Sequence, residues 1–177
     1  DVGYAPEQPV YYSHKLHAGL MGMDCRYCHT SVEVGAHANV PTTQVCMNCH
    51  KGVLTDSPEI QKLTAAHEAG LPVRWEKVHL LPDYAYFNHA VHVDVGVGCS
   101  SCHGPVDEMP LMWRDNTLNM EWCLECHRAP ERFVRPREEL FTTDWSPEDA
   151  LGVSQAELGR ELIERYDVHP KTSCSTC

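Results

Sequence analysis

Ten cysteines carry the clearest chemical pattern in this sequence, because they form five pairs with two residues between the members of each pair. In four of the pairs a histidine follows the second cysteine directly. The pattern C-x-x-C-H attaches haem c covalently: the two thiols form thioether bonds to the haem vinyl groups, and the imidazole binds the iron on its proximal side. The complete motifs are Cys25–Cys28–His29, Cys46–Cys49–His50, Cys99–Cys102–His103 and Cys123–Cys126–His127.

The fifth pair, Cys174 and Cys177, ends at the last residue of the sequence. We predict that it also forms thioether bonds, so that the chain carries five haems c, four of them at complete motifs. An open dithiol or a disulfide is the alternative for this pair. We expect a histidine directly after Cys177 in the natural chain. Without it, His169 would be the nearest candidate ligand for the fifth iron.

The spacing of the motif explains how one haem can meet three side chains. Residues i, i+3 and i+4 of a helix share a face, so both sulfurs and the imidazole can reach one porphyrin. Zinc is the main alternative, because the intervals of 17 residues between Cys28 and Cys46 and 20 between Cys102 and Cys123 suit paired CxxC ligands. A four-cysteine zinc site has no use for a histidine after every pair, so we favour haem.

Eight histidines remain after the four proximal ones, and five haems need at most five distal ligands. One H-x-x-H pair precedes the first haem motif in each half of the chain. We expect His14 and His89 to serve the first haem of their half, and His17 and His92 to reach neighbouring haems. Further distal candidates are His37 and His79, followed by Met120 as a thioether ligand and His169. His67 is predicted to pack on the apolar face of a helix.

The two halves resemble one another, which indicates an internal duplication of a two-haem unit. His14 and His89 are 75 residues apart, and the first haem motifs, beginning at Cys25 and Cys99, are 74 apart. We therefore expect a two-haem unit with a following helix at 1–70, a second two-haem unit at 71–136, and a C-terminal helix with the fifth cysteine pair at 137–177. The fold class is mainly α-helical and irregular, a small multihaem cytochrome c with short helices and long loops around covalent haems.

Two helices outside the motifs have clear start signals. Ser57-Pro58 predicts a helix that runs to about Glu68. The capping box from Ser154 to Glu157 predicts a second helix near the C-terminus. Its apolar stripe is Leu158, Leu162, Ile163 and Tyr166.

The charge and composition limit the partners and the location. The formal net charge is −11 at pH 7, which argues against nucleic acid as a partner. No run of 18 apolar residues is present, so no segment predicts a membrane span. Because haem c is attached outside the bacterial cytoplasm, we expect the periplasmic side of the inner membrane. Attachment there would come from partner subunits or from an N-terminal anchor that preceded Asp1.

At these motifs the sequence resembles known families. The aromatic residue before each H-x-x-H pair, followed by C-x-x-C-H, is similar to class III multihaem cytochromes c. The chain resembles more closely the pentahaem cytochrome c subunit of alternative complex III, a quinol-oxidising respiratory complex. The matching segments are residues 13–19, 46–51, 75–79, 81–83, 86–89, 102–105 and 120–123.

This resemblance implies an electron-transfer relay that is not itself an enzyme and has no catalytic residue. Its partners would be an iron–sulfur or molybdopterin-like subunit and quinol-binding membrane subunits, with a monohaem cytochrome c or a cytochrome oxidase as acceptor. The resemblance also favours His79 as a ligand, because it lies within a matching segment. Two alternatives are a multihaem reductase with an open haem site, such as a nitrite or sulfur-oxyanion reductase, and a free periplasmic electron shuttle.

Overall fold

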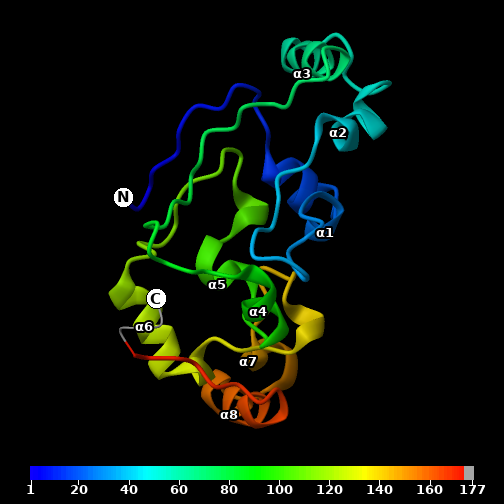
Figure 1. Cartoon of the computed structure of the whole chain (residues 1–177). Helices are drawn as coiled ribbons and strands as arrows, with labels where there is room; N and C mark the ends of the chain where they lie inside the picture. The colour runs from blue at the N-terminus through cyan, green and yellow to red at the C-terminus, as the bar shows by residue number, and fades with distance from the viewer. Residues whose placement is uncertain (174–177) are drawn as a thin grey trace.

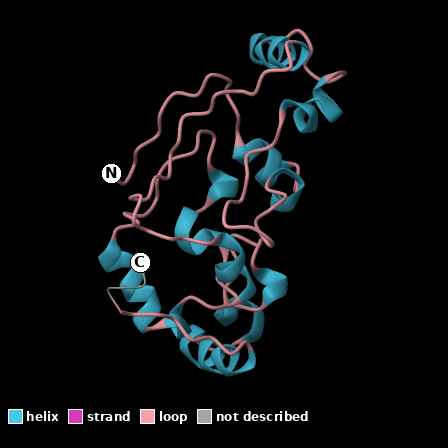
Figure 2. Ribbon diagram, in the orientation of Figure 1, coloured by secondary structure: helices cyan, strands magenta, loops and turns pink. Residues whose placement is uncertain are grey.

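A computed structural model describes residues 1–173 as short helices joined by long loops (Figures 1 and 2). The cysteine pair at 174 and 177 lies outside the described residues. The helices are η1 (Lys15–Leu20), α1 (Cys25–Cys28), α2 (Thr43–His50), α3 (Pro58–Glu68), α4 (His89–Asp94), α5 (Cys99–His103), η2 (Val106–Glu108), α6 (Met120–Arg128), η3 (Pro130–Arg132), η4 (Arg137–Glu139), α7 (Pro147–Leu151) and α8 (Gln155–Arg165).

The fold class predicted from the sequence is confirmed. Within the described part of the chain, the one β-type pairing is the isolated antiparallel bridge between Val97 and Val134. Figure 2 shows the helices of the described residues joined by long loops. No helix among residues 1–173 is long and apolar enough to cross a membrane.

Three of the four complete motifs lie wholly in a short helix, as their spacing predicts, and in the motif at Cys25 the histidine directly follows α1. The Asp24 side chain accepts a hydrogen bond from the amide of Arg26 and begins α1. Asn119 begins α6 in the same way by accepting from the amide of Trp122. Such caps satisfy amide groups that have no partner within the helix. At α1 and α6, local sequence therefore helps to begin the helical turn that presents the two thiols.

The helices α2 and α3 pack together in a small satellite core. Met47 of α2 is buried against Ile60 and Leu63 of α3. The imidazole of His67 lies within hydrogen-bonding distance of the Thr43 hydroxyl, at 3.2 Å. Figure 1 shows this pair of helices at the end of the molecule far from α7 and α8. The predicted helix from Ser57 to about Glu68 is confirmed.

At the opposite end, α8 packs closely on η3. The Ser154 side chain accepts from the amide of Glu157 and begins the helix, as the capping box predicts. Leu162 of its apolar stripe is fully buried. Gly159 is also buried, and a Cβ atom built on it would lie 1.9 Å from the carbonyl oxygen of Glu131. The absence of a side chain at Gly159 is therefore what permits this approach.

The apolar core of the described residues is small for a chain of this size. Large apolar and aromatic side chains such as Leu20, Tyr27 and Val34 are exposed. A core of this kind fits the expectation that bound haems supply much of the apolar packing. The buried apolar side chains are Val10, Val32, Met47, Ile60, Leu63, Met109, Val134, Leu140, Leu162 and Val168.

Candidate haem sites

The eight described cysteines form four pairs, each on one short helix. The motif histidine lies in the same helix in α2, α5 and α6 and directly after the helix in α1. Burial raises the pKa of Cys99 to about 11 and that of Cys102 to about 12. These neutral thiols differ from the low-pKa thiols of catalytic cysteines. Among residues 1–173 there is no group of three or more His, Cys, Asp and Glu side chains placed to hold a metal ion on their own.

Each proximal histidine of the four motifs faces a second histidine from an H-x-x-H pair. The His14 and His29 ring centroids are 6.5 Å apart, and those of His89 and His103 are 6.3 Å apart. The second residue of each H-x-x-H pair faces the other motif of the same half. The His17 and His50 rings are separated by 6.2 Å, and the His92 and His127 rings by 6.2 Å.

This repeated separation has a simple chemical meaning. A first-row metal ion lies about 2 Å from an imidazole nitrogen. The ring centre lies about 1 Å further out, so two imidazoles on opposite sides of one iron have centroids about 6 Å apart. All four pairs match this spacing, although they come from different helices and loops. The residues present therefore fit four haem irons, each between two imidazoles.

The second ring nitrogen of most of these histidines is also arranged for metal binding. The Nδ1 atoms of His17 and His92 donate to the carbonyl oxygens of Ser13 and Asn88, four residues earlier. Because a carbonyl only accepts, each such Nδ1 carries the proton and Nε2 is left with a lone pair for iron. The same contact is made from His29 to Asn39 at 2.6 Å, His50 to Val53 at 3.1 Å, His89 to Ala36 at 2.9 Å and His127 to Lys171 at 2.7 Å.

Burial favours the neutral form that a ligand must have. Burial, as the largest cause, and the charges of His29 and His17 together lower the pKa of His14 to about 4. Burial lowers the pKa of His103 to about 3, again with contributions from neighbouring histidines. The uncharged imidazole is therefore the stable form of both residues at neutral pH.

An aromatic ring precedes each H-x-x-H pair and touches both of its histidines. Tyr12 stacks on His17 with centroids 4.5 Å apart and meets His14 edge-on at 4.9 Å. Phe87 lies in the same way against His92 at 4.5 Å and His89 at 4.7 Å. These two rings were not among the predicted site residues. Their place two residues before the first histidine of each pair was the signal that could have identified them.

The other candidate ligands lie in different settings. His79 is partly buried, its Nε2 has no hydrogen-bond partner, and its ring meets that of His103 edge-on at 4.5 Å. That distance is too short for an iron between the two rings. His37 is exposed, and Met120 is 58% exposed. His169 is exposed and pairs with Asp167, so within residues 1–173 the structure places neither His37 nor His169 opposite a proximal histidine.

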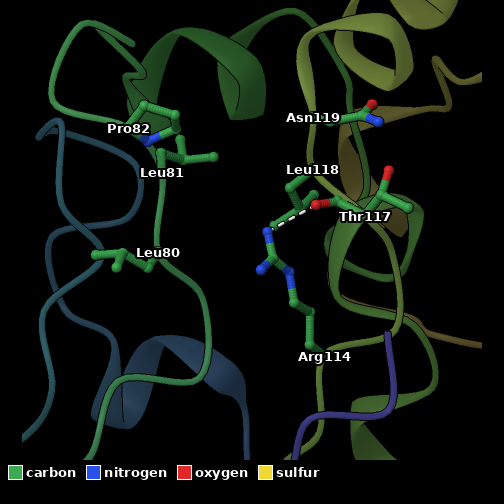
Figure 3. Close-up of a pocket in the computed structure, with 7 residues that line it drawn as sticks. All are labelled: Leu80, Leu81, Pro82, Arg114, Thr117, Leu118 and Asn119. Carbon is green, nitrogen blue, oxygen red and sulfur yellow. Dashed lines mark hydrogen bonds between the residues drawn. The ribbon is translucent and has the colours of Figure 1, made fainter. Parts of the chain in front are cut away.

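A cavity of about 350 Å³ lies between residues 80–82, which follow His79 in the sequence, and the segment that leads into α6 (Figure 3). Its walls are mostly apolar. The Arg114 guanidinium donates to the carbonyl oxygens of Asn116 and Thr117, the latter at 2.6 Å. This cation is thus held by the backbone at the cavity wall. The lining residues are Leu80, Leu81, Pro82, Arg114, Thr117, Leu118 and Asn119.

Comparison with known proteins identifies a family of c-type cytochromes. Residues 85–177, more than half of the chain, match the family described as cytochrome c7 and related cytochrome c. The chain is also 39% identical over 99 residues to the menaquinone reductase, multihaem cytochrome c subunit, of Nitratidesulfovibrio vulgaris. That similarity covers 55% of this chain and 46% of the relative, so the chain matches less than half the length of that protein. The chain belongs to the family of cytochrome c7 and related cytochromes c, and haem c is its cofactor.

Proposed function

We propose that the four imidazole pairs are the axial ligands of four six-coordinate, low-spin haems. Sites 1 to 4 are numbered here by their motifs, which begin at Cys25, Cys46, Cys99 and Cys123. The distal ligands are His14 for site 1, His17 for site 2, His89 for site 3 and His92 for site 4. The ring separations and the protonated Nδ1 atoms support this assignment.

We propose His79 as the distal ligand of a fifth haem attached through Cys174 and Cys177. Its Nε2 is buried and has no hydrogen-bond partner, which suits a nitrogen that binds a metal. The other remaining histidines are less suitable. His67 contacts the Thr43 hydroxyl, while His37 and His169 are exposed.

Fully ligated haems suit electron transfer better than catalysis. Haem iron supplies one-electron chemistry, and two imidazoles held by the fold limit the change in geometry that accompanies it. The distal histidines also block the position that a substrate would occupy. We therefore propose that the chain is an electron carrier and not the catalytic subunit of an enzyme.

We propose further that this carrier is the relay subunit of a membrane-bound quinol:acceptor oxidoreductase of the alternative complex III type. The segments that resemble that family support this proposal, as does a relative that is named as a subunit of a quinone-linked complex. An iron–sulfur subunit would pass electrons to the chain, and a cytochrome c or an oxidase would receive them. The net charge of −11 would favour a basic docking partner on the periplasmic side.

A specific observation supports a second candidate in which electrons flow the opposite way. The relative from Nitratidesulfovibrio vulgaris is named a menaquinone reductase subunit. In that case the chain would carry electrons towards quinone. The native complex can be isolated and tested for quinol oxidation and for quinone reduction. The reaction that its haems support would distinguish the two directions of electron flow.

The observation that carries the relay function is that each proximal histidine faces a second imidazole, with ring centroids 6.2 to 6.5 Å apart. We expect the native protein to be low-spin in both oxidation states and to bind almost no carbon monoxide. Optical spectra with and without carbon monoxide test this. A native high-spin haem that binds carbon monoxide, together with nitrite or sulfite reduction, would support the reductase alternative instead.

Haem content provides a second prediction. We expect five covalent haems per chain, because every cysteine belongs to a CxxC pair. Intact mass and a pyridine haemochrome assay on the full-length protein measure this number. Four haems would limit attachment to the complete motifs and would leave the last cysteine pair for another role.

The angles between the paired rings predict two spectroscopic classes of ferric haem. The ring planes are nearly parallel at site 1, at 7°, and at site 3, at 5°. They are inclined by 61° at site 2 and by 34° at site 4. Two iron d orbitals interact with the π systems of the imidazoles. Parallel imidazole planes increase the energy difference between these two orbitals, whereas inclined planes leave their energies closer together. We expect rhombic electron paramagnetic resonance (EPR) signals from sites 1 and 3 and more anisotropic signals from sites 2 and 4.

A further inference from the structure

We infer that the haem sites of the motifs at Cys25 and Cys99 lie next to each other and form the junction between the two halves of the chain. This gives the order site 2, site 1, site 3, site 4 along the molecule. The inference rests on the proposed ligand assignment and adds a route to it. Electrons that cross between the halves would pass between sites 1 and 3.

Reciprocal backbone hydrogen bonds tie the distal side of each of these two sites to the other half. The amide of Ala90, next to His89, donates to the carbonyl of Gly35 at 3.1 Å. The amide of Lys15, next to His14, donates to the carbonyl of Met109 at 2.9 Å. Gly35 follows the proximal histidine of site 1 by six residues, and Met109 follows that of site 3 by six residues. The two contacts are therefore equivalent under the internal repeat.

The hydrogen bonds between the two halves also include a proposed haem ligand. The backbone amide and the Nδ1 atom of His89 both donate to the carbonyl of Ala36, at 3.1 and 2.9 Å. The loop that follows the first haem motif thus orients the distal imidazole of site 3. The Met109 side chain, on the matching loop of the second half, is fully buried. The distal side of each of these two sites is therefore hydrogen-bonded to the other half.

Within each half, the outer site is joined to the inner one. His14 and His17 lie one helical turn apart and serve sites 1 and 2. His89 and His92 connect sites 3 and 4 in the same way. The two halves thus meet at their inner sites.

Magnetic relaxation tests this order with the complete haem protein. His14→Ala would make site 1 high-spin, and a high-spin ferric centre accelerates the spin relaxation of a close neighbour with a steep dependence on distance. We expect the rhombic EPR signal of site 3 to need clearly more microwave power for saturation than in the unmodified protein. The matched variant His17→Ala makes site 2 high-spin and should leave the site 3 signal almost unchanged.

The reciprocal variants repeat the measurement from the other half. They still test the order if His14→Ala or His17→Ala does not fold. His89→Ala should accelerate relaxation at site 1, whereas His92→Ala should not. A larger effect of His17→Ala than of His14→Ala on site 3 would overturn the inferred order. Failure of His14→Ala or His89→Ala to produce any high-spin signal would instead overturn the ligand assignment, so the two failures can be told apart.

Discussion

Replacement of His89 with alanine is expected to convert one haem of the protein from low-spin to high-spin. The imidazole of His89 faces that of His103 with ring centroids 6.3 Å apart, so its loss removes the distal ligand of site 3. The short alanine side chain cannot reach the iron position. Carbon monoxide should then bind to one haem per chain, against almost none in the unmodified protein. Optical difference spectra and EPR measure both effects.

A matched control uses a histidine that lies outside the four pairs. His67 is partly buried and contacts the Thr43 hydroxyl, so His67→Ala removes an imidazole without removing a proposed ligand. It should remain fully low-spin and should not bind carbon monoxide. If His89→Ala stayed low-spin while His67→Ala became high-spin, the assignment of distal ligands would be wrong.

His89→Met adds a test in which a ligand is kept. Methionine can bind haem iron through its thioether, and Met/His ligation raises the reduction potential relative to two histidines. We expect this variant to stay low-spin while one haem becomes easier to reduce. Redox titration followed by EPR distinguishes it from the alanine variant, because the changed haem should stay low-spin in His89→Met and become high-spin in His89→Ala.

The helices around the haem motifs follow from local sequence, which is why they could be predicted. Thiols and imidazole at positions i, i+3 and i+4 require one helical turn, and α1, α2, α5 and α6 supply it. The helices α3 and α8 were equally predictable, because Pro58 and Ser154 are start signals that act within a few residues. Such signals do not depend on what packs against the helix.

The long-range arrangement could not be obtained in this way. His89 is oriented by a carbonyl 53 residues away, and His127 by a carbonyl 44 residues away. No local pattern marks a backbone carbonyl as the acceptor for a distant imidazole. Exposure presents a similar difficulty, since His37 is exposed and His79 is partly buried, and residue type and spacing alone made both of them candidates. The family resemblance favoured His79, but the burial of the two side chains depends on the packing of distant loops.

Gly159→Ala is expected to destabilise the C-terminal part of the protein. In a free helix, alanine would be favoured over glycine by about 1 kcal/mol. At Gly159 the added Cβ would lie 1.9 Å from the Glu131 carbonyl oxygen, so α8 would have to move away from η3. Overpacking of this kind typically costs about 1–3 kcal/mol. The free energy of unfolding, measured with denaturant on the haem-loaded protein, should decrease by a similar amount.

The effect should also reach a haem ligand, because α8 leads into the segment that orients His127. Val168 is buried after the end of α8, and the Lys171 carbonyl accepts from the His127 Nδ1 at 2.7 Å. Displacement of α8 should therefore alter the anisotropic EPR signal of site 4 while the rhombic signals stay the same. Gly52→Ala is the matched control, because a Cβ at Gly52 would meet no atom within 4 Å. Equal stability losses in the two variants would contradict the close contact between α8 and η3 as the cause.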